Sequence, residues 1–400
     1  MYKRSSLVLA SAAVLFCNLA VFPTLAANCA PIPPGLVSWW PGEGSAADIY
    51  GPNNGTAEGV TFGPGEVGNG FVFEGGWVQV PDSPSLNLTS GISLVFWFNR
   101  DNFAGPFQGV IAKRDTNLPA PSNYGVNFSQ PHYGLGLYFD DPSVGYPGNG
   151  SDDGNHFEVM RTALPTAEAW HLYVGEYRQT ATGVELRAYV DDVLADAQSF
   201  PGLLANGLTE LPLEIGTTIP GFEPFHGILD EIQIYNRPIT ERVIRRIFNA
   251  GSSGMCPPIP IPALSSQNAR LLPDPAAATR DRVGLDATIY FSRRGAHTIH
   301  SLSSRELSLS IGGFTQTLEP GTLQCHGDGT CEYTGSGHGI RALSIGSGVA
   351  QVHLEGVDAA LIPPGPNQML LRLGHAIGRA TIDISAPIPP PEEPPWILMP

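Results

Sequence analysis

The chain has 400 residues and a formal net charge of −16, with 47 Gly, 38 Pro and only two Lys. Residues 27–256 carry 25 Asp and Glu against 10 Lys and Arg, and residues 257–400 carry 12 against 9. Such an acidic surface disfavours nucleic acids and anionic membranes, which are bound by basic patches, and suits calcium ions or neutral ligands. The Gly and Pro content favours short strands and turns, so an all-β protein is expected.

Residues 1–26 have the features of a secretory signal peptide. Two basic residues precede an apolar run over residues 7–22, and Ala26 ends a segment that suits signal peptidase. The run is too short to span a membrane, and bulky Phe16 argues against a lipoprotein site at Cys17. We therefore expect a protein exported by its signal peptide to a secreted, extracellular or periplasmic location.

Four cysteines remain after the signal peptide, and four cysteines allow three pairings. Cys325 and Cys331 enclose CHGDGTC, which is typical of a stapled hairpin tip. This favours a second bond between Cys29 and Cys256, which would tie together the two ends of the first domain.

More than ten short strand-like segments separated by turns lie between residues 27 and 256, and they predict a β-sandwich. The stretch Phe225–Gly251 begins with a strand that places Ile228, Asp230, Ile232 and Ile234 on one face if it alternates strictly. A lone carboxylate in an apolar face needs a partner. A short helix is expected after this strand, with Thr240 as its cap and Gly251 as its stop.

The order of motifs resembles the laminin G-like, concanavalin A-like jelly-roll domain of bacterial secreted proteins over residues 29–256. The motifs are GLVSWWPGEGSAADIYGPNNGTAEG, FGPGEVGNGFVFEGGWVQVPDSPSLN, GISLVFWF, AWHLYVGEYRQTATGVELRAYVDDVLA and HGILDEIQIYNRPITERVIRRIFNAGSSGMCP. The resemblance implies a two-sheet jelly roll that binds or adheres, often with a structural calcium ion. It names no ligand, because one fold hosts many functions.

The resemblance also implies a metal site. In that family the acid of the late strand and the Asp- and Asn-rich loop after the first strand meet around a metal, and the matching positions here are Asp230 with Asp48 and Asn54. Their oxygens are of the kind that Ca²⁺ takes. The alternative is that Asp230 accepts hydrogen bonds from backbone amides without any ion.

A second acidic stretch, Phe139–Glu158, includes Asp152 and Asp153 and has no apolar pattern. A mobile, solvated loop is one interpretation, and a ligand site supported by a second calcium ion is the other. Tyr133 and Tyr146 are candidates for stacking on a sugar ring, although either can equally belong to the core or rim of the sandwich.

Signals of catalysis are weak. Gly63–Gly68 matches a phosphate-binding glycine pattern, but a strand follows it where a helix would be needed. Asp230 and Glu231 resemble the closely spaced acids of jelly-roll glycoside hydrolases, yet strict alternation would point them to opposite faces. The enzyme alternative, a glycan-active hydrolase, therefore rests on these two acids alone.

The C-terminal part changes in composition after Cys256. Residues 257–280 are predicted to be a Pro- and Ala-rich linker, residues 281–385 a second, smaller β-sandwich of seven to nine strands, and residues 386–400 a Pro-rich tail. Six of the ten histidines lie here without the spacing of a standard metal site.

The leading hypothesis is a secreted binding or adhesion protein that recognises carbohydrate or surface and matrix ligands through a calcium-supported laminin G-like domain. Its partner would be a glycan or an extracellular protein. The alternatives are the glycan-active hydrolase and a purely structural surface or spacer protein.

Overall fold

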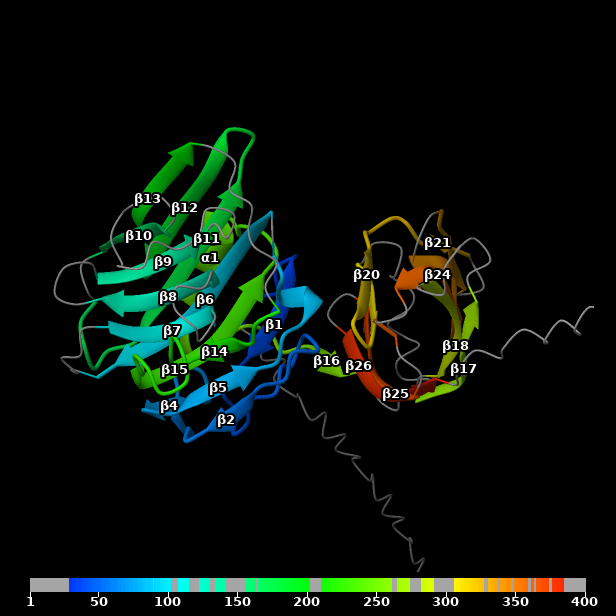
Figure 1. The fold of residues 1–400 in the computed structure, drawn as a ribbon, viewed down its shortest axis with the longest axis horizontal. Helices are drawn as coiled ribbons and strands as arrows, with labels where there is room; N and C mark the ends of the chain where they lie inside the picture. The colour runs from blue at the N-terminus through cyan, green and yellow to red at the C-terminus, as the bar shows by residue number, and fades with distance from the viewer. Residues whose placement is uncertain are drawn as a thin grey trace, which may run out of the picture.

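The computed structural model describes residues 29–384, apart from gaps at 89, 102–106, 115–121, 130–133, 141–155, 163–164, 202–209, 261–264, 274–281, 291–305, 327–329, 337–338, 347–348, 359–360, 363–364 and 374–375. Two β-domains follow one another along the chain (Figure 1). The predicted all-β fold, a two-sheet jelly roll followed by a smaller β-sandwich, is confirmed. No helix within the described ranges is long and apolar enough to cross a membrane.

The first domain packs two antiparallel sheets face to face. The eight-stranded sheet has the order β13 (Val193–Pro201), β12 (Gly183–Val190), β11 (His171–Gln179), β6 (Gly91–Arg100), β15 (His226–Tyr235), β4 (Asn69–Glu74) and β3 (Thr61–Pro64), and β1 (Leu36–Trp40) also pairs with β15. The seven-stranded sheet has the order β10 (His156–Thr162), β9 (Gly134–Asp140), β8 (Ser122–Ser129), β7 (Phe107–Arg114), β14 (Leu213–Ile215), β5 (Trp77–Val80) and β2 (Thr56–Glu58). A short 3-10 helix, η1 (Pro84–Leu86), follows β5.

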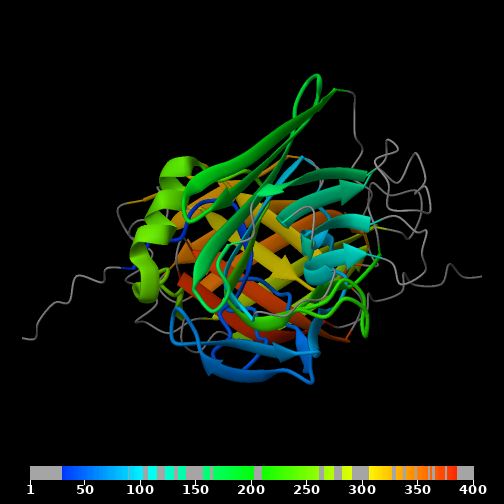
Figure 2. The ribbon, with the colours of Figure 1, turned by 90° about the vertical axis from the view of Figure 1, so that its left-hand side faces the viewer.

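Strand β6 shows how the core is built. Leu94 and Phe96 point between the two sheets, whereas Val95 and Trp97 belong to an apolar cluster on the outer face of the eight-stranded sheet. Helix α1 (Glu241–Ala250) covers that cluster, and its Phe248 ring stacks on Trp97 with centroids 5.8 Å apart. Figure 2 shows α1 running along the side of the sandwich. Strand β6 is therefore apolar on both faces because one face packs in the core between the sheets and the other packs in the core beneath α1.

The ends of α1 match the sequence prediction in position. Thr240 is the N-cap residue, although its side chain makes no capping hydrogen bond, and Gly251 is the C-cap residue with φ 46°. A 3-10 turn, η2 (Gly251–Ser253), then leads towards Cys256.

Strand β15 contains a β-bulge that strict alternation did not predict. Asp230 pairs with Trp97 and Gln233 with Val95, so β15 advances three residues where β6 advances two. The extra residue is Glu231, which has φ 52°. The residues of β15 in the core between the sheets are Leu229, Ile232 and Ile234. The predicted assignment of faces is therefore wrong on the N-terminal side of the bulge, because one inserted residue reverses the alternation.

The second domain is a smaller sandwich of two sheets around its own core. One sheet has the order β16 (Ile259–Pro260), β26 (Ala376–Ile384), β25 (Gly365–Leu373), β19 (Leu307–Ile311) and β20 (Phe314–Leu318), and Figure 1 shows it on the side facing the first domain. The other has the order β17 (Ser265–Pro273), β18 (Arg282–Tyr290), β24 (Val349–Asp358), β23 (Gly339–Gly346), β22 (Cys331–Thr334) and β21 (Gln324–Cys325).

Strands β16 and β17 correct the predicted linker over residues 257–280, because both belong to sheets of the second domain. Each lies at the edge of its sheet. Edge strands tolerate the missing amide hydrogens of proline, so a Pro-rich composition does not exclude them.

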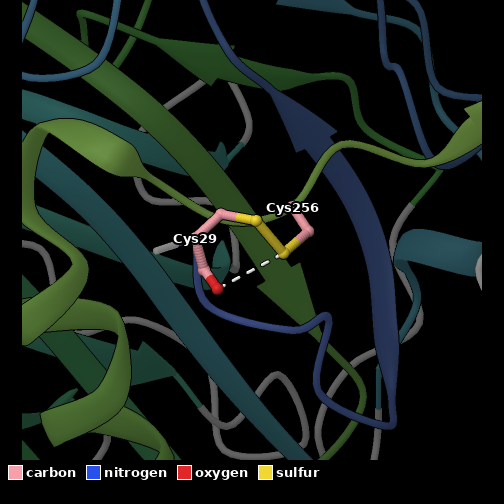
Figure 3. Close-up of a disulfide and its surroundings, with 2 residues drawn as sticks. All are labelled: Cys29 and Cys256. Atoms are coloured by element: carbon pink, nitrogen blue, oxygen red, sulfur yellow. Dashed lines mark hydrogen bonds between the residues drawn. A yellow bond between two sulfur atoms is a disulfide. The ribbon is translucent and has the colours of Figure 1, made fainter. Parts of the chain in front are cut away.

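Both predicted disulfides are confirmed. Cys325 and Cys331 are bonded and face each other across the β21–β22 hairpin. Cys29 and Cys256 are bonded with their Cα atoms 4.9 Å apart, although 227 positions separate them in the chain (Figure 3).

Candidate functional site

The loop Asp48–Asn54, which follows β1, is folded around the carboxylate of Asp48. Its Oδ1 atom accepts three backbone N–H bonds and its Oδ2 atom a fourth. The donors are Trp39 (2.9 Å), Tyr50 (2.9 Å), Gly51 (2.6 Å) and Asn53 (3.1 Å). The side-chain oxygen of Asn54 accepts the Asp48 N–H at 3.0 Å. The loop thus satisfies its buried carboxylate with its own backbone and that of β1.

Two arginines of the second domain hold the carbonyl oxygens of the same loop. Arg379 Nη2 donates to the Asp48 oxygen at 2.7 Å and to the Gly51 oxygen at 3.1 Å. Arg372 Nε donates to the Tyr50 oxygen at 3.2 Å, and its guanidinium lies 4.3 Å from the centre of the Tyr50 ring. We call Arg372 and Arg379 the arginine clasp, since together they fasten the second domain to the first.

These contacts occupy oxygen atoms that the calcium ion predicted at Asp48, Asn54 and Asp230 would need as ligands. Calcium takes oxygen ligands, but the carboxylate oxygens of Asp48 face N–H donors and the backbone oxygens of the loop are bonded to arginines. Within the described ranges no three His, Cys, Asp or Glu residues are grouped as a metal site. The arrangement does not fit a calcium ion at this loop, and calcium binding stays a prediction.

Asp230 lies against a different segment, the turn between β3 and β4. Its Oδ2 atom accepts the Val67 N–H at 2.8 Å, and its buried Oδ1 atom has no hydrogen-bond partner among the described residues. Burial raises the pKa of Asp230 to about 7, although backbone N–H groups of the turn and bulge lower it. Burial, and then the charge of Asp230, raise the pKa of Glu231 well above its usual value.

Both acids of the bulge are shielded from solvent, with Asp230 0% and Glu231 4% exposed. The two acids therefore influence each other, but they are not presented to a substrate. The hydrolase alternative gains no support from them.

A cleft of about 430 Å³ lies between the two domains, next to the arginine clasp. The first domain contributes the start of β1, Pro52, residues around η1, and the turn Asn236–Arg237. The second domain contributes Glu306, residues of β19 and β20, Glu319, Leu361 and Arg372. We call this space the domain cleft.

Four charged side chains share the domain cleft. Burial raises the pKa of Glu306, the charge of Glu319 raises it further, and Arg372 and Arg237 lower it, so Glu306 lies within electrostatic reach of the other three groups. Arg372 is bonded to the first domain. The side chains of Arg237, Glu306 and Glu319 form no hydrogen bond or ion pair with any other described residue.

Hydroxyl groups cover the wall formed by β19 and β20. Leu307, Leu309 and Ile311 of β19 point into the core of the second domain, so Ser308 and Ser310 point outward. The other hydroxyl groups on this wall come from β20, where Thr315 Oγ1 donates to Ser310 Oγ at 2.9 Å and Thr317 Oγ1 to Ser308 Oγ at 3.2 Å. Ser310, Thr315 and Thr317 line the cleft.

The predicted ligand-binding residues Tyr133, Tyr146, Asp152 and Asp153 lie outside the described residues, so their role stays a prediction. The domain cleft was not predicted, because its walls come from segments that share no motif and lie as far apart in the chain as Gly35 and Arg372. The only local signal was the hydroxyl alternation Leu-Ser-Leu-Ser-Ile in β19, which predicts a strand with one polar face.

Comparison with known proteins finds one family model that is similar to part of the first domain. Residues 73–245 match the family model of the concanavalin A-like lectin/glucanases superfamily. No curated protein matches the chain.

Three solved structures show distant likeness. Domain 4 of an extracellular arabinanase from Geobacillus stearothermophilus, in complex with arabinotriose, is 16% identical, covers 52% of this chain and 96% of its own, and has a TM-score of 0.40. The binding domain of Paraclostridial Mosquitocidal Protein 1 is 12% identical, with 81% and 92% coverage and a TM-score of 0.41. Trypanosoma rangeli sialidase with the inhibitor DANA is 16% identical, with 55% and 35% coverage and a TM-score of 0.38.

The family match includes most strands of both sheets of the jelly roll and the first half of α1, but the first motif of the resemblance, residues 35–59, lies outside it. The family match does not extend into the second domain. Over residues 73–245 the chain is thus similar to the concanavalin A-like lectin/glucanases superfamily.

Proposed function

We propose that this protein binds carbohydrate in the domain cleft. One observation carries the proposal: donor-only and acceptor-only side chains that no other described residue pairs lie together in the cleft. Arg237 offers only donors, whereas Glu306 and Glu319, when ionised, offer only acceptors. A sugar hydroxyl both donates and accepts, so adjacent hydroxyls of one ring can bond to both kinds at once.

The charge balance of the cleft favours a neutral ligand. Two guanidinium groups face two carboxyl groups, so a ligand with a net charge would meet repulsion as well as attraction. Apolar contact is available from Phe314 and Leu361, which can pack against the C–H faces of a sugar ring. The volume lies within the range of about 300–1,000 Å³ for ligand pockets, and pockets are frequent at domain interfaces.

The family match supports this function at the level of the fold, since residues 73–245 have a lectin-type architecture. Two disulfides are typical of proteins in oxidising compartments, so we propose that the predicted signal peptide exports the chain to glycans outside the cell. Calcium is no part of the proposal, because the atoms of the Asp48–Asn54 loop are already bonded.

The test is calorimetric titration of the mature chain with neutral oligosaccharides of arabinan, xylan, mannan and glucans. We expect at least one to bind, and Glu306→Gln to weaken it about tenfold or more, because a hydrogen bond to a charged group contributes about 1.5–3 kcal/mol. Thr317→Trp fills the cleft and should abolish the same binding.

Glu332→Gln is the matched control, since Glu332 is an exposed carboxylate on the other sheet of the second domain. Binding that survives both cleft variants would overturn the proposal. Failure of every neutral oligosaccharide to bind the unaltered chain would favour the structural spacer alternative.

A further inference from the structure

A second hollow lies on the first domain, against the outer face of helix α1. It has a volume of about 390 Å³ and is shallow. One wall is formed by Arg242, Arg245, Arg246 and Asn249 of α1, and the other by the segment from Cys29 to Pro31. We call it the arginine pocket.

Helix periodicity explains why these arginines gather. Ile244 and Ile247 are buried against the sheet, so the residues between them turn outward. Arg242, Arg245 and Arg246 are spaced three and four positions apart, and this spacing places them on one exposed face. The Cys29–Cys256 bond holds the opposite wall in place, because it anchors Cys29 just beyond the end of the helix (Figure 3).

The charge of the pocket is not balanced by its neighbours. Arg245 Nε lies 3.3 Å from Asp192, but Arg242 and Arg246 form no ion pair with any described residue. Like charges four positions apart on a helix repel, so the arrangement is slightly unfavourable for the helix itself. It also stands out in a domain that carries 25 acidic against 10 basic residues over 27–256.

We propose that the arginine pocket binds the sulfate or carboxylate groups of an acidic polysaccharide. Guanidinium groups form paired hydrogen bonds with planar or tetrahedral oxyanions, and three of them on one face can hold successive groups along a polymer. The Asn249 amide adds a donor and an acceptor for a neighbouring hydroxyl. The inference does not need the domain cleft, because none of its residues lines that cleft.

The experiment compares dextran sulfate with uncharged dextran, which has the same sugar backbone, on the mature chain by biolayer interferometry. We expect dextran sulfate to bind, dextran not to bind, and the affinity to fall as NaCl is raised. Polygalacturonate in a parallel arm distinguishes carboxylate from sulfate as the preferred group. The combined variant Arg242→Gln, Arg245→Gln and Arg246→Gln should lose at least about tenfold in affinity.

A matched control removes the same charge elsewhere, through Arg178→Gln, Arg187→Gln and Arg341→Gln. The proposal is overturned if this control weakens binding as much as the pocket variant, since net charge alone would then explain the loss. It is also overturned if neither acidic polymer binds. Neutral oligosaccharide binding should be unchanged in the pocket variant, so failure of this inference and failure of the cleft proposal give different results.

Discussion

In the described part of the first domain, four carboxyl groups are buried and have raised pKa values. They are Glu176, Glu214, Asp230 and Glu231. Burial is the largest cause in each case, because an ionised group loses its hydration in the protein interior. Sequence reasoning singled out Asp230 and Glu231 because they interrupt an apolar strand. It could not single out Glu176 or Glu214, because a glutamate within a strand is ordinarily expected on the face exposed to solvent.

Glu176 offers a clear test of pH dependence. Burial raises its pKa to about 7, although the charges of Arg187 and Arg178 and hydrogen bonds from Ile239 N and the Ser93 hydroxyl lower it. The unfolded chain ionises this group near its ordinary pKa, so between that value and about pH 7 the folded state binds more protons. The contribution of Glu176 to stability should therefore be fully present at low pH and be lost as pH rises to about 7.

In the unaltered chain, the unfolding free energy should fall between about pH 5 and pH 8 as Glu176 ionises. In Glu176→Gln we expect this fall to be smaller by up to about 3 kcal/mol. Urea unfolding followed by tryptophan fluorescence measures it, because five of the six Trp residues lie in the first domain. A variant with the same pH dependence as the unaltered chain would show that Glu176 ionises normally in the folded state.

At the scale of the element, β15 shows what the sequence could and could not predict. Its position and the helix after it were predicted from local signals such as Thr240 and Gly251, and the disulfide beyond it from the pairing left open once Cys325 and Cys331 are joined. The bulge was not, because nothing in Leu-Asp-Glu-Ile marks Glu231 as an inserted residue. A positive φ at a glutamate is costly in isolation, so this conformation is imposed by pairing with β6 and β4.

The bulge predicts an unusual order of stability between two substitutions of Glu231. Both Glu231→Ala and Glu231→Gly remove the buried carboxyl, but only Gly adopts φ near 52° without strain. In an ordinary strand Ala would be the more stable, whereas here we expect Gly to exceed Ala by about 1 kcal/mol in unfolding free energy. Urea unfolding of the pair measures the difference, and equal or reversed stabilities would contradict the bulge.

At the scale of the whole molecule, the order of motifs was sufficient to predict the jelly roll, and strand patterns were sufficient to predict a second sandwich. The interface between them was beyond prediction. The arginine clasp joins positions 322 to 331 apart, and Arg372 and Arg379 look like ordinary strand residues in the sequence. Leu370 and Ile377 join the outer apolar cluster of the first domain, so the interface is partly apolar as well.

The clasp predicts that the two domains unfold together. Combined Arg372→Gln and Arg379→Gln removes the charge-assisted bonds to the Asp48–Asn54 loop and should lower the stability of the first domain by about 1–3 kcal/mol. Calorimetry should then show two transitions in place of one. Arg341→Gln is the control, because Arg341 pairs with Glu355 on the other sheet of the second domain at 3.0 Å.

The same calorimetry tests whether the arginine clasp or a metal ion stabilises the Asp48–Asn54 loop. Scans of the unaltered chain in calcium and in EGTA should coincide if the arginines suffice. A melting temperature that rises with calcium, and loses that rise in Asp230→Asn, would instead establish the predicted calcium site.

The Cys29–Cys256 bond also determines how the protein would carry mechanical load. The chain enters and leaves the first domain at two residues whose Cα atoms are 4.9 Å apart. Tension applied between the N-terminus and the second domain would pass through the sulfur atoms and bypass the sheets between them. While that bond is intact, pulling on the molecule from its ends would strain the junction and the second sandwich and leave the first domain folded.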